Sequence, residues 1–257
     1  MFRCQNNGVT FSLLSELLPG QPLFSYQRDT ETMTFSIGAR CARTGQFAVA
    51  VSSSSPAGAA RCAFARAGVG AVTSQNVTDP RLGPWALDLM EAGASAEQAR
   101  DIIISRCTYP AYRQMTLIDR EGRTAVWSGE KALGLNAQFE GVDVACAGNL
   151  LATKAVPQAI ADSFAQSDPQ LELGLRVIQA MQAGIAAGGE AGPVKSAGLL
   201  VVDTQKWPLA DLRVDWDEDP ITRLNTLWDV WAPQMHDYVT RCLNPDAAPS
   251  YGVPGDE

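Results

Sequence analysis

Alternating apolar and polar residues predict that the folded domain opens with a β-hairpin. The segments TFSIGAR at 34–40 and QFAVAVSSSS at 46–55 have the period of two that is typical of strands. The turn between them ends at Gly45, which can take the positive φ that such a turn needs. The folded pattern therefore begins at Thr34.

Further apolar runs predict five more strands, and the last run is continuous, as in a strand buried on both faces. The runs are AGVGAVTS at 67–74, QMTLID at 114–119, RTAVWS at 123–128, VDVACA at 142–147 and AGLLVVD at 197–203. The second and third runs flank a short turn with a glycine and so form another hairpin.

Helical stripes and cap residues lie between these strands. The segment LGPWALDLMEAG at 82–93 has one apolar face, and Ser95 with Gln98 matches a capping box. The Asp-Pro pairs at 168–169 and 219–220 match helix starts. Strands and paired helices follow one another without the strict alternation of a doubly wound parallel sheet. The order predicts an α+β fold in which two antiparallel sheets pack together with helices on both sides.

The 257 residues suit one domain with flanking segments. Residues 1–33 contain only a short apolar stretch, and we expect them to be an extension outside the core. Residues 34–243 would form the domain. Residues 244–257 contain several Pro and Gly, and we expect a flexible tail.

Charge and hydropathy exclude two classes of partner. The formal net charge is −8, whereas a nucleic-acid binder needs a clustered basic surface and an anionic membrane attracts basic proteins. The chain has no run of about 20 apolar residues. The apolar stretch at 11–18 is interrupted by Glu16 and lacks the basic segment of a secretory signal. We expect a cytoplasmic protein that binds neither nucleic acid nor membrane.

Cysteine and histidine usage limits the chemistry. The six cysteines form no C-x-x-C pair, so we expect reduced thiols that are mostly buried. His236 is the single histidine, which argues against a Ser-His-Asp or Cys-His catalytic group and against a zinc site. The carboxylates at 211–219 are expected to be a solvated face rather than a cation site. The sequence predicts no metal and no organic cofactor.

Thr34 is the candidate nucleophile that needs no histidine. Met33 precedes it, so either a start at Met33 or a cleavage after it would leave Thr34 with a free α-amine. An N-terminal threonine supplies a hydroxyl that attacks and an α-amine, with a pKa near 8, that accepts the proton. The position of Thr34 alone favours the simpler interpretation that it is an ordinary strand residue.

Polar residues at strand ends supply the other candidates. Ser52 and Ser54 belong to a serine run that could line a site with hydroxyls, although a polar turn before a proline is the simpler interpretation. Arg66 could hold an anionic group of a substrate. The remaining candidates are Gln75, Asn76 and Asn149. Their carboxamides could donate hydrogen bonds to an oxyanion, but asparagine and glutamine are also ordinary turn residues.

Several longer motifs resemble one bacterial family, domain of unknown function 1028, which has an N-terminal-nucleophile hydrolase-like fold. They are TFSI at 34–37, ARAGVGAVTSQN at 65–76, the turn at 80–83, YRQ at 112–114, D-x-x-G-R at 119–123, GNLL at 148–151, SAGLLVV at 196–202 and DLRVD at 211–215. The resemblance covers nearly the whole domain.

The resemblance implies a four-layer αββα sandwich of two antiparallel sheets, with members that begin at the threonine of TFSI. It also implies hydrolysis of an amide (C–N) bond. Together with the candidate residues above, this predicts a hydrolase of a small amide or ureido compound, with Thr34 and Asn149 catalytic and Arg66, Gln75, Asn76, Ser52 and Ser54 around the substrate. The sheet edges that such folds leave are compatible with a homodimer.

Two alternatives stay open. Relatives often have a lysine after the second strand, where this chain has Ser55 and Pro56, and Lys195 stands where glutamine is usual. A chain that keeps residues 1–33 would have a blocked α-amine and could be a non-catalytic small-molecule-binding protein. The tryptophans at 216, 228 and 231 could instead form a docking face in a larger enzyme, although core packing explains them as well.

Overall fold

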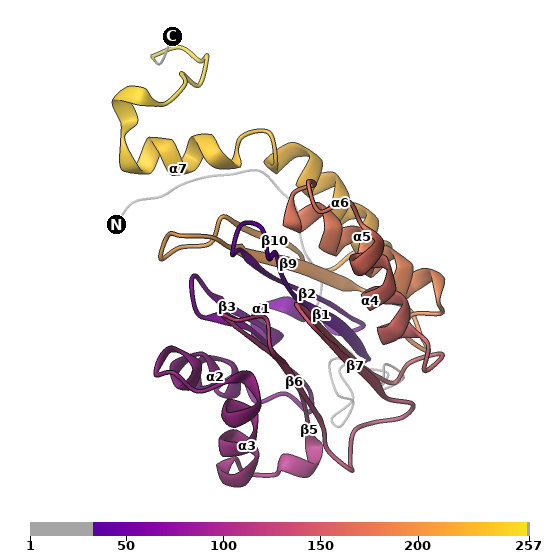
Figure 1. Ribbon diagram of the computed structural model, residues 1–257. Coiled ribbons are helices and arrows are strands. Elements are labelled where there is room, and N and C mark those ends of the chain that lie inside the picture. The colour runs from indigo at the N-terminus through magenta and orange to yellow at the C-terminus, as the bar shows by residue number, and fades with distance from the viewer. Residues whose placement is uncertain (1–32, 256–257) are drawn as a thin grey trace, which may run out of the picture.

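The computed structural model describes residues 33–255, which form two antiparallel sheets with helices on both outer faces (Figure 1). The strands are β1 (Thr34–Arg40), β2 (Phe47–Ser53), β3 (Ala63–Arg66), β4 (Gly70–Asn76), β5 (Arg113–Asp119), β6 (Thr124–Ser128), β7 (Ala137–Gly141), β8 (Val144–Asn149), β9 (Ser196–Val202) and β10 (Ala210–Val214). The helices are α1 (Ala59–Cys62), α2 (Leu82–Glu91), α3 (Ala96–Arg106), α4 (Val156–Gln166), α5 (Leu173–Ala186), α6 (Pro220–Trp231) and α7 (Met235–Leu243), with 3-10 turns at Pro110–Tyr112 and Pro245–Ala247.

The layers follow the predicted αββα order. The large sheet has the strand order β10-β9-β2-β1-β8-β7, and the small sheet has the order β3-β4-β5-β6. Helices α4, α5 and α6 cover the outer face of the large sheet, and α2 and α3 cover that of the small sheet (Figure 1). The predicted α+β sandwich of two antiparallel sheets is therefore confirmed.

Local sequence signals predicted several elements correctly. The first hairpin pairs Thr34 with Ser53, and Gly45 in its turn has φ of 79°. Ser95 accepts from the Gln98 backbone while the Gln98 side chain accepts from the Ser95 backbone, as a capping box requires. The Asp-Pro pair at 219–220 caps α6 as expected.

Other expectations need correction. The strand predicted at 67–74 begins at Gly70, because residues 67–69 form the turn that joins it to the unpredicted strand β3. Asp168 does not begin a helix. Its carboxylate accepts from the Gln170 backbone in a turn, and α5 starts at Leu173. The short strands β7 and β10 and helix α4 were also not predicted.

The space between the sheets changes from apolar to polar along the strands, and this change positions the candidate site. Alternate residues of β1, such as Phe35, pack against α4 and α5. The opposite face meets the small sheet, where Val49, Val51 and Ile118 form an apolar cluster. Toward the Thr34 end the facing side chains are polar and almost fully buried. They are Thr34, Ser36, Ser53, Thr73, Gln75, Gln114, Thr116 and Asn149.

The segments that flank the sandwich are described only in part. The expected extension at 1–33 lies outside the described residues except for Met33. At the other end, Tyr251 packs on Tyr238 and the Arg241 guanidinium, so part of the predicted tail contacts α7. Trp228 is buried against Gly174 in the core, whereas Trp216 is exposed. None of the helices within residues 33–255 has the length and hydropathy to cross a membrane.

Candidate functional site

Thr34 lies between two strand ends that carry polar side chains. It pairs with Ser53 of β2 on one side and with Asn149 of β8 on the other. Directly opposite residues of antiparallel strands point to the same face, so all three side chains face the small sheet. Thr34 is 6% exposed in the chain that retains Met33. The structure thus brings the two predicted catalytic residues together.

The peptide carbonyl before Thr34 accepts three hydrogen bonds. The Thr34 and Ser53 hydroxyls each donate to the Met33 oxygen at 2.7 Å, and the Ser54 N–H donates to it at 3.2 Å. The Met33 N–H donates to the Ser54 hydroxyl at 2.8 Å. Hydrogen-bond donors directed at a carbonyl oxygen polarise it and stabilise negative charge on it. The Met33 carbonyl is therefore held where an oxyanion would be stabilised.

Gln114 joins the two sheets beside Thr34. Its carboxamide oxygen accepts from Gln75 Nε2 at 2.8 Å and from Asn149 Nδ2 at 3.2 Å. Its nitrogen donates to the Ser128 hydroxyl at 2.9 Å and to the Gly148 carbonyl at 3.1 Å. Gln114 was not among the predicted site residues, although it lies in the YRQ motif. This residue orients the two carboxamides that were selected.

The network leaves two carboxamide oxygens free. Gln75 Oε1 and Asn149 Oδ1 are buried and have no hydrogen-bond partner among the described residues. A buried acceptor without a donor is costly, so such a group indicates a place where a donor can bind. Asn149 stands directly opposite Thr34 in β8, so its oxygen belongs to the surroundings of the candidate nucleophile.

Two predicted binding residues have other partners. Arg66 pairs with Gly70 at the end of β4 away from Gln75, and its guanidinium contacts Asp88 and Glu91 of α2. The structure does not bring Arg66 to Thr34. Asn76, with φ of 70°, donates to the Tyr112 carbonyl at 2.6 Å and accepts from the Leu133 N–H at 3.1 Å. Its carboxamide joins two loops.

Ser52 and the unpredicted Glu190 form a pair on the other face of the large sheet. Ser52 stands opposite Phe35, and its hydroxyl donates to Glu190 Oε1 at 3.3 Å. Glu190 is 5% exposed, and burial raises the pKa of its carboxyl to about 8. A carboxyl with this pKa is mostly protonated at neutral pH. The glycine-rich segment 188–193 around Glu190 is the sequence signal that could have drawn attention to it.

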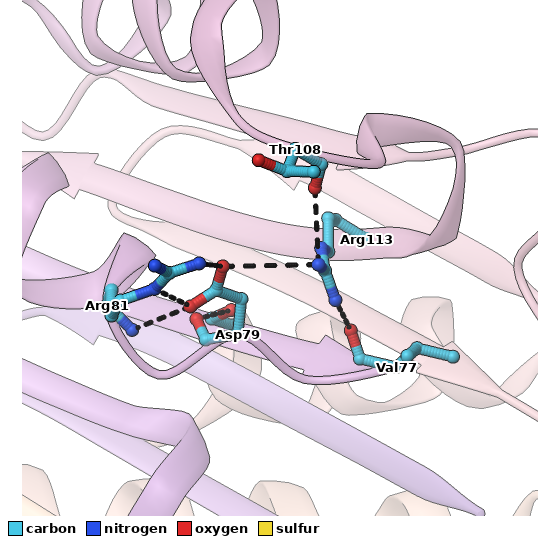
Figure 2. Close-up of polar contacts among 6 residues, drawn as sticks. Val77, Asp79, Arg81, Thr108 and Arg113 are labelled. Atoms are coloured by element: carbon cyan, nitrogen blue, oxygen red, sulfur yellow. Dashed lines mark hydrogen bonds and ion pairs between the residues drawn. The ribbon is translucent and has the colours of Figure 1, made fainter.

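A second cluster of charges fixes the loop that follows β4 (Figure 2). Arg81 Nη2 lies 2.7 Å from Asp79 Oδ2, and Arg113 Nη2 lies 3.9 Å from the same oxygen. Arg113 also donates to the Val77 carbonyl at 2.5 Å and to the Thr108 carbonyl at 3.2 Å. Hydrogen bonding from Arg81, and then the charges of Arg81 and Arg113, lower the Asp79 pKa. The cluster holds the segment between β4 and α2 against β5.

This cluster makes stability depend on pH. A carboxylate whose pKa is lowered by folding stabilises the protein above its unfolded pKa of about 4, and this contribution is lost as pH falls through the folded pKa. We expect Asp79→Asn to lower the free energy of unfolding by about 2 kcal/mol at pH 7, because the buried Arg113 loses its charge partner. The difference should shrink near pH 3.

Urea denaturation at pH 7 and pH 3 measures this effect. Asp88→Asn is the control, since Asp88 is exposed in its pair with Arg66 and such pairs contribute about 1 kcal/mol or less. Equal destabilisation by the two variants at pH 7 would contradict the assignment.

The histidine, the free cysteines and the possible metal ligands among the described residues lie outside this site. His236 is exposed on α7, as expected. Within residues 33–255, no group of three or more His, Cys, Asp or Glu side chains is placed to hold a metal ion. Cys41, Cys62, Cys107, Cys146 and Cys242 are free thiols. The polar residues around Thr34 remain the candidate site.

Comparison with known proteins identifies the family. Residues 34–224 match the model of a family of unknown function, DUF1028. The chain belongs to this family. The match begins at Thr34 and ends at Leu224.

A solved structure of the same family agrees with the DUF1028 assignment. The crystal structure of protein SPO2555 from Silicibacter pomeroyi, also described as DUF1028, is 25% identical, with a TM-score of 0.74 over 80% of this chain and 89% of that chain. Anbu (ancestral beta-subunit) from Yersinia bercovieri is 10% identical, with a TM-score of 0.36 over 79% of this chain and 96% of that chain. No curated protein sequence matches the chain.

Proposed function

We propose that this protein is an amidohydrolase of the N-terminal-nucleophile type, with Thr34 as the nucleophile. The observation that carries the proposal is the Met33 carbonyl, whose oxygen accepts from the Thr34 hydroxyl, the Ser53 hydroxyl and the Ser54 N–H. An acyl group at the same position would have its oxygen stabilised and a hydroxyl nucleophile beside it. This is the arrangement that acyl transfer needs.

The mechanism requires a free α-amine on Thr34. Cleavage of the Met33–Thr34 bond converts the amide nitrogen into an amine, which can accept the proton of the Thr34 hydroxyl as the oxygen attacks a substrate carbonyl. The unpartnered oxygen of Asn149 can accept from this amine and orient it. The protonated α-amine then gives this proton to the substrate nitrogen, the C–N bond breaks, and the amine product leaves an ester of the acyl group on the Thr34 oxygen. Water, deprotonated by the same α-amine, attacks this ester and releases the acid and the free Thr34 hydroxyl. We assign the substrate to small amides or ureido compounds.

The groups that we assign to stabilise the oxyanion differ from the carboxamides that the sequence suggested. Gln75 and Asn149 each donate to Gln114, and Asn76 binds two loops. We assign stabilisation of the oxyanion to the Ser54 N–H and the Ser53 hydroxyl, because these groups already bind the Met33 carbonyl oxygen. Gln75, Asn149 and Gln114 then position this end of the two sheets.

Whether the Thr34 nitrogen is a free amine or an amide distinguishes the hydrolase from a non-catalytic small-molecule-binding protein. While Met33 is attached, that nitrogen is an amide and cannot act as a base, which favours reversible binding without turnover. The test is intact-mass analysis and N-terminal sequencing of protein expressed from Met1. A chain that begins at Thr34, followed by a covalent acyl adduct on Thr34 with an amide substrate, supports the hydrolase. A chain that keeps Met33 and forms no adduct overturns it in favour of a binding protein.

A further inference from the structure

A surface hollow of about 280 Å³ lies between the end of α5 and the start of α6. The loop after α5 contributes Glu190 and Gly192, and the segment before α6 contributes Glu218 and Asp219. The lining includes these three carboxyl groups and no lysine or arginine side chain. The described wall of the hollow is therefore acidic.

Met33 packs on Gly192, one of the residues that line this hollow. A Cβ atom built on Gly192 would lie 2.4 Å from Met33 Cε, so the thioether packs directly on the glycine backbone. Met33 is 7% exposed. Removal of Met33, which the proposed function requires, takes away this side chain. The space that the side chain leaves lies between Gly192 of the hollow and the position of the Met33 carbonyl beside the Thr34 hydroxyl.

Glu190 is the buried acidic residue of this lining, and it has no ion-pair partner among the described residues. Its Oε1 accepts from Ser52, and its Oε2 is buried with no partner among the described residues. Its other neighbours at the strand ends, Ser54 and Leu151, carry no charge. Lys195 is the nearby cation, and its ammonium contacts Glu218 at the rim. A buried carboxyl with a free oxygen is stabilised by an incoming donor or cation.

We infer that this hollow selects substrates whose acyl portion carries a primary ammonium or guanidinium group, with Glu190 as the counter-ion. The inference rests on the proposed function, because the substrate would occupy the place that Met33 leaves and its far end would lie in the hollow. The scissile carbonyl takes the place of the Met33 carbonyl, and the cationic end passes Gly192 to Glu190. Neutral substrates of the same shape leave Glu190 protonated and gain no ion pair.

Equilibrium binding tests the pocket without any need for turnover. Isothermal titration of the full chain with n-butylammonium and with 1-butanol compares a cation with a neutral compound of similar shape. Because burial raises the Glu190 pKa to about 8, the carboxyl must lose a proton to pair with the cation. Affinity for n-butylammonium should rise about 50-fold between pH 6 and pH 8, with proton release at pH 7, and affinity for 1-butanol should not change.

Two substitutions in the lining distinguish the contribution of Glu190 to cation binding from that of the exposed rim. Glu190→Gln should remove the pH dependence and weaken n-butylammonium binding at pH 8 by about tenfold or more. Glu218→Gln, at the exposed rim, should change affinity by less than about threefold. Equal affinity for the two compounds, or unchanged binding in Glu190→Gln, overturns the inference. Cation binding without any acyl-Thr34 adduct would support the cation pocket and contradict the hydrolase. An acyl-Thr34 adduct without a preference for cations would support the hydrolase and contradict the cation pocket.

Discussion

Thr34→Ala is expected to lose hydrolysis by about three orders of magnitude or more, because it removes the oxygen that attacks the substrate. Thr34→Ser keeps the hydroxyl and should retain measurable turnover. Ser53→Ala keeps the nucleophile and removes one donor to the carbonyl oxygen, so we expect a loss of about 10²-fold in kcat. The three variants therefore separate attack from oxyanion stabilisation.

The measurement is the rate of acyl transfer from an amide that forms an adduct with the unmodified protein. Circular dichroism and thermal denaturation of each variant control for folding. Thr34→Ala protein that folds and still hydrolyses the substrate at the original rate would rule out Thr34 as nucleophile. Equal rates in Ser53→Ala and the unmodified protein would remove Ser53 from the oxyanion site.

Gln114→Leu is expected to lower the free energy of unfolding by about 3–5 kcal/mol. Leucine has a similar size but makes none of the four hydrogen bonds of Gln114, so the carboxamides of Gln75 and Asn149 and the Gly148 carbonyl lose a buried partner. Each buried polar group left unpaired costs about 1–3 kcal/mol, and partial re-pairing limits the sum. This is a large fraction of the 5–15 kcal/mol typical of folded domains.

Chemical denaturation with a matched variant checks the effect. Gln138→Leu makes the same substitution at an exposed position, where the carboxamide accepts from Ser128 at the edge of the same network. It should change stability by about 0.5 kcal/mol or less. Similar losses in the two variants would show that the Gln114 network does not hold the sheets together.

The fold was predictable where the sequence signal is local. Alternation over seven residues and a glycine at the turn predicted β1 and β2, and a serine with a glutamine three positions on predicted the start of α3. Strands β3, β7 and β10 are four or five residues long and lie at sheet edges, with partly exposed side chains. Short edge strands have no clear alternation because solvent, rather than a core, surrounds part of their surface.

The candidate site was predictable in part for the same reason. Thr34 and Asn149 were selected as polar residues at strand termini, and strand pairing places them side by side. Arg66 was selected by the same rule, but β3 is paired so that Arg66 lies at the opposite end of the small sheet. Gln114 and Glu190 were missed because their roles depend on contacts between distant segments, which one sequence without its register does not specify.

The central position of β1 also determines when the site can form during synthesis. Its neighbour β8 is more than one hundred residues further along the chain, and β2 pairs with β9, which ends at Val202. Pairings of such long range form late, because a long loop must close before they contribute stability. A nascent chain that ends before Asn149 therefore has Thr34 and β2 but not the complete β8, and one that ends before Val202 lacks the complete β9 that pairs with β2. Chemistry at Thr34 that uses the side chains of Ser53 and Asn149 must therefore wait until β8 has left the ribosome.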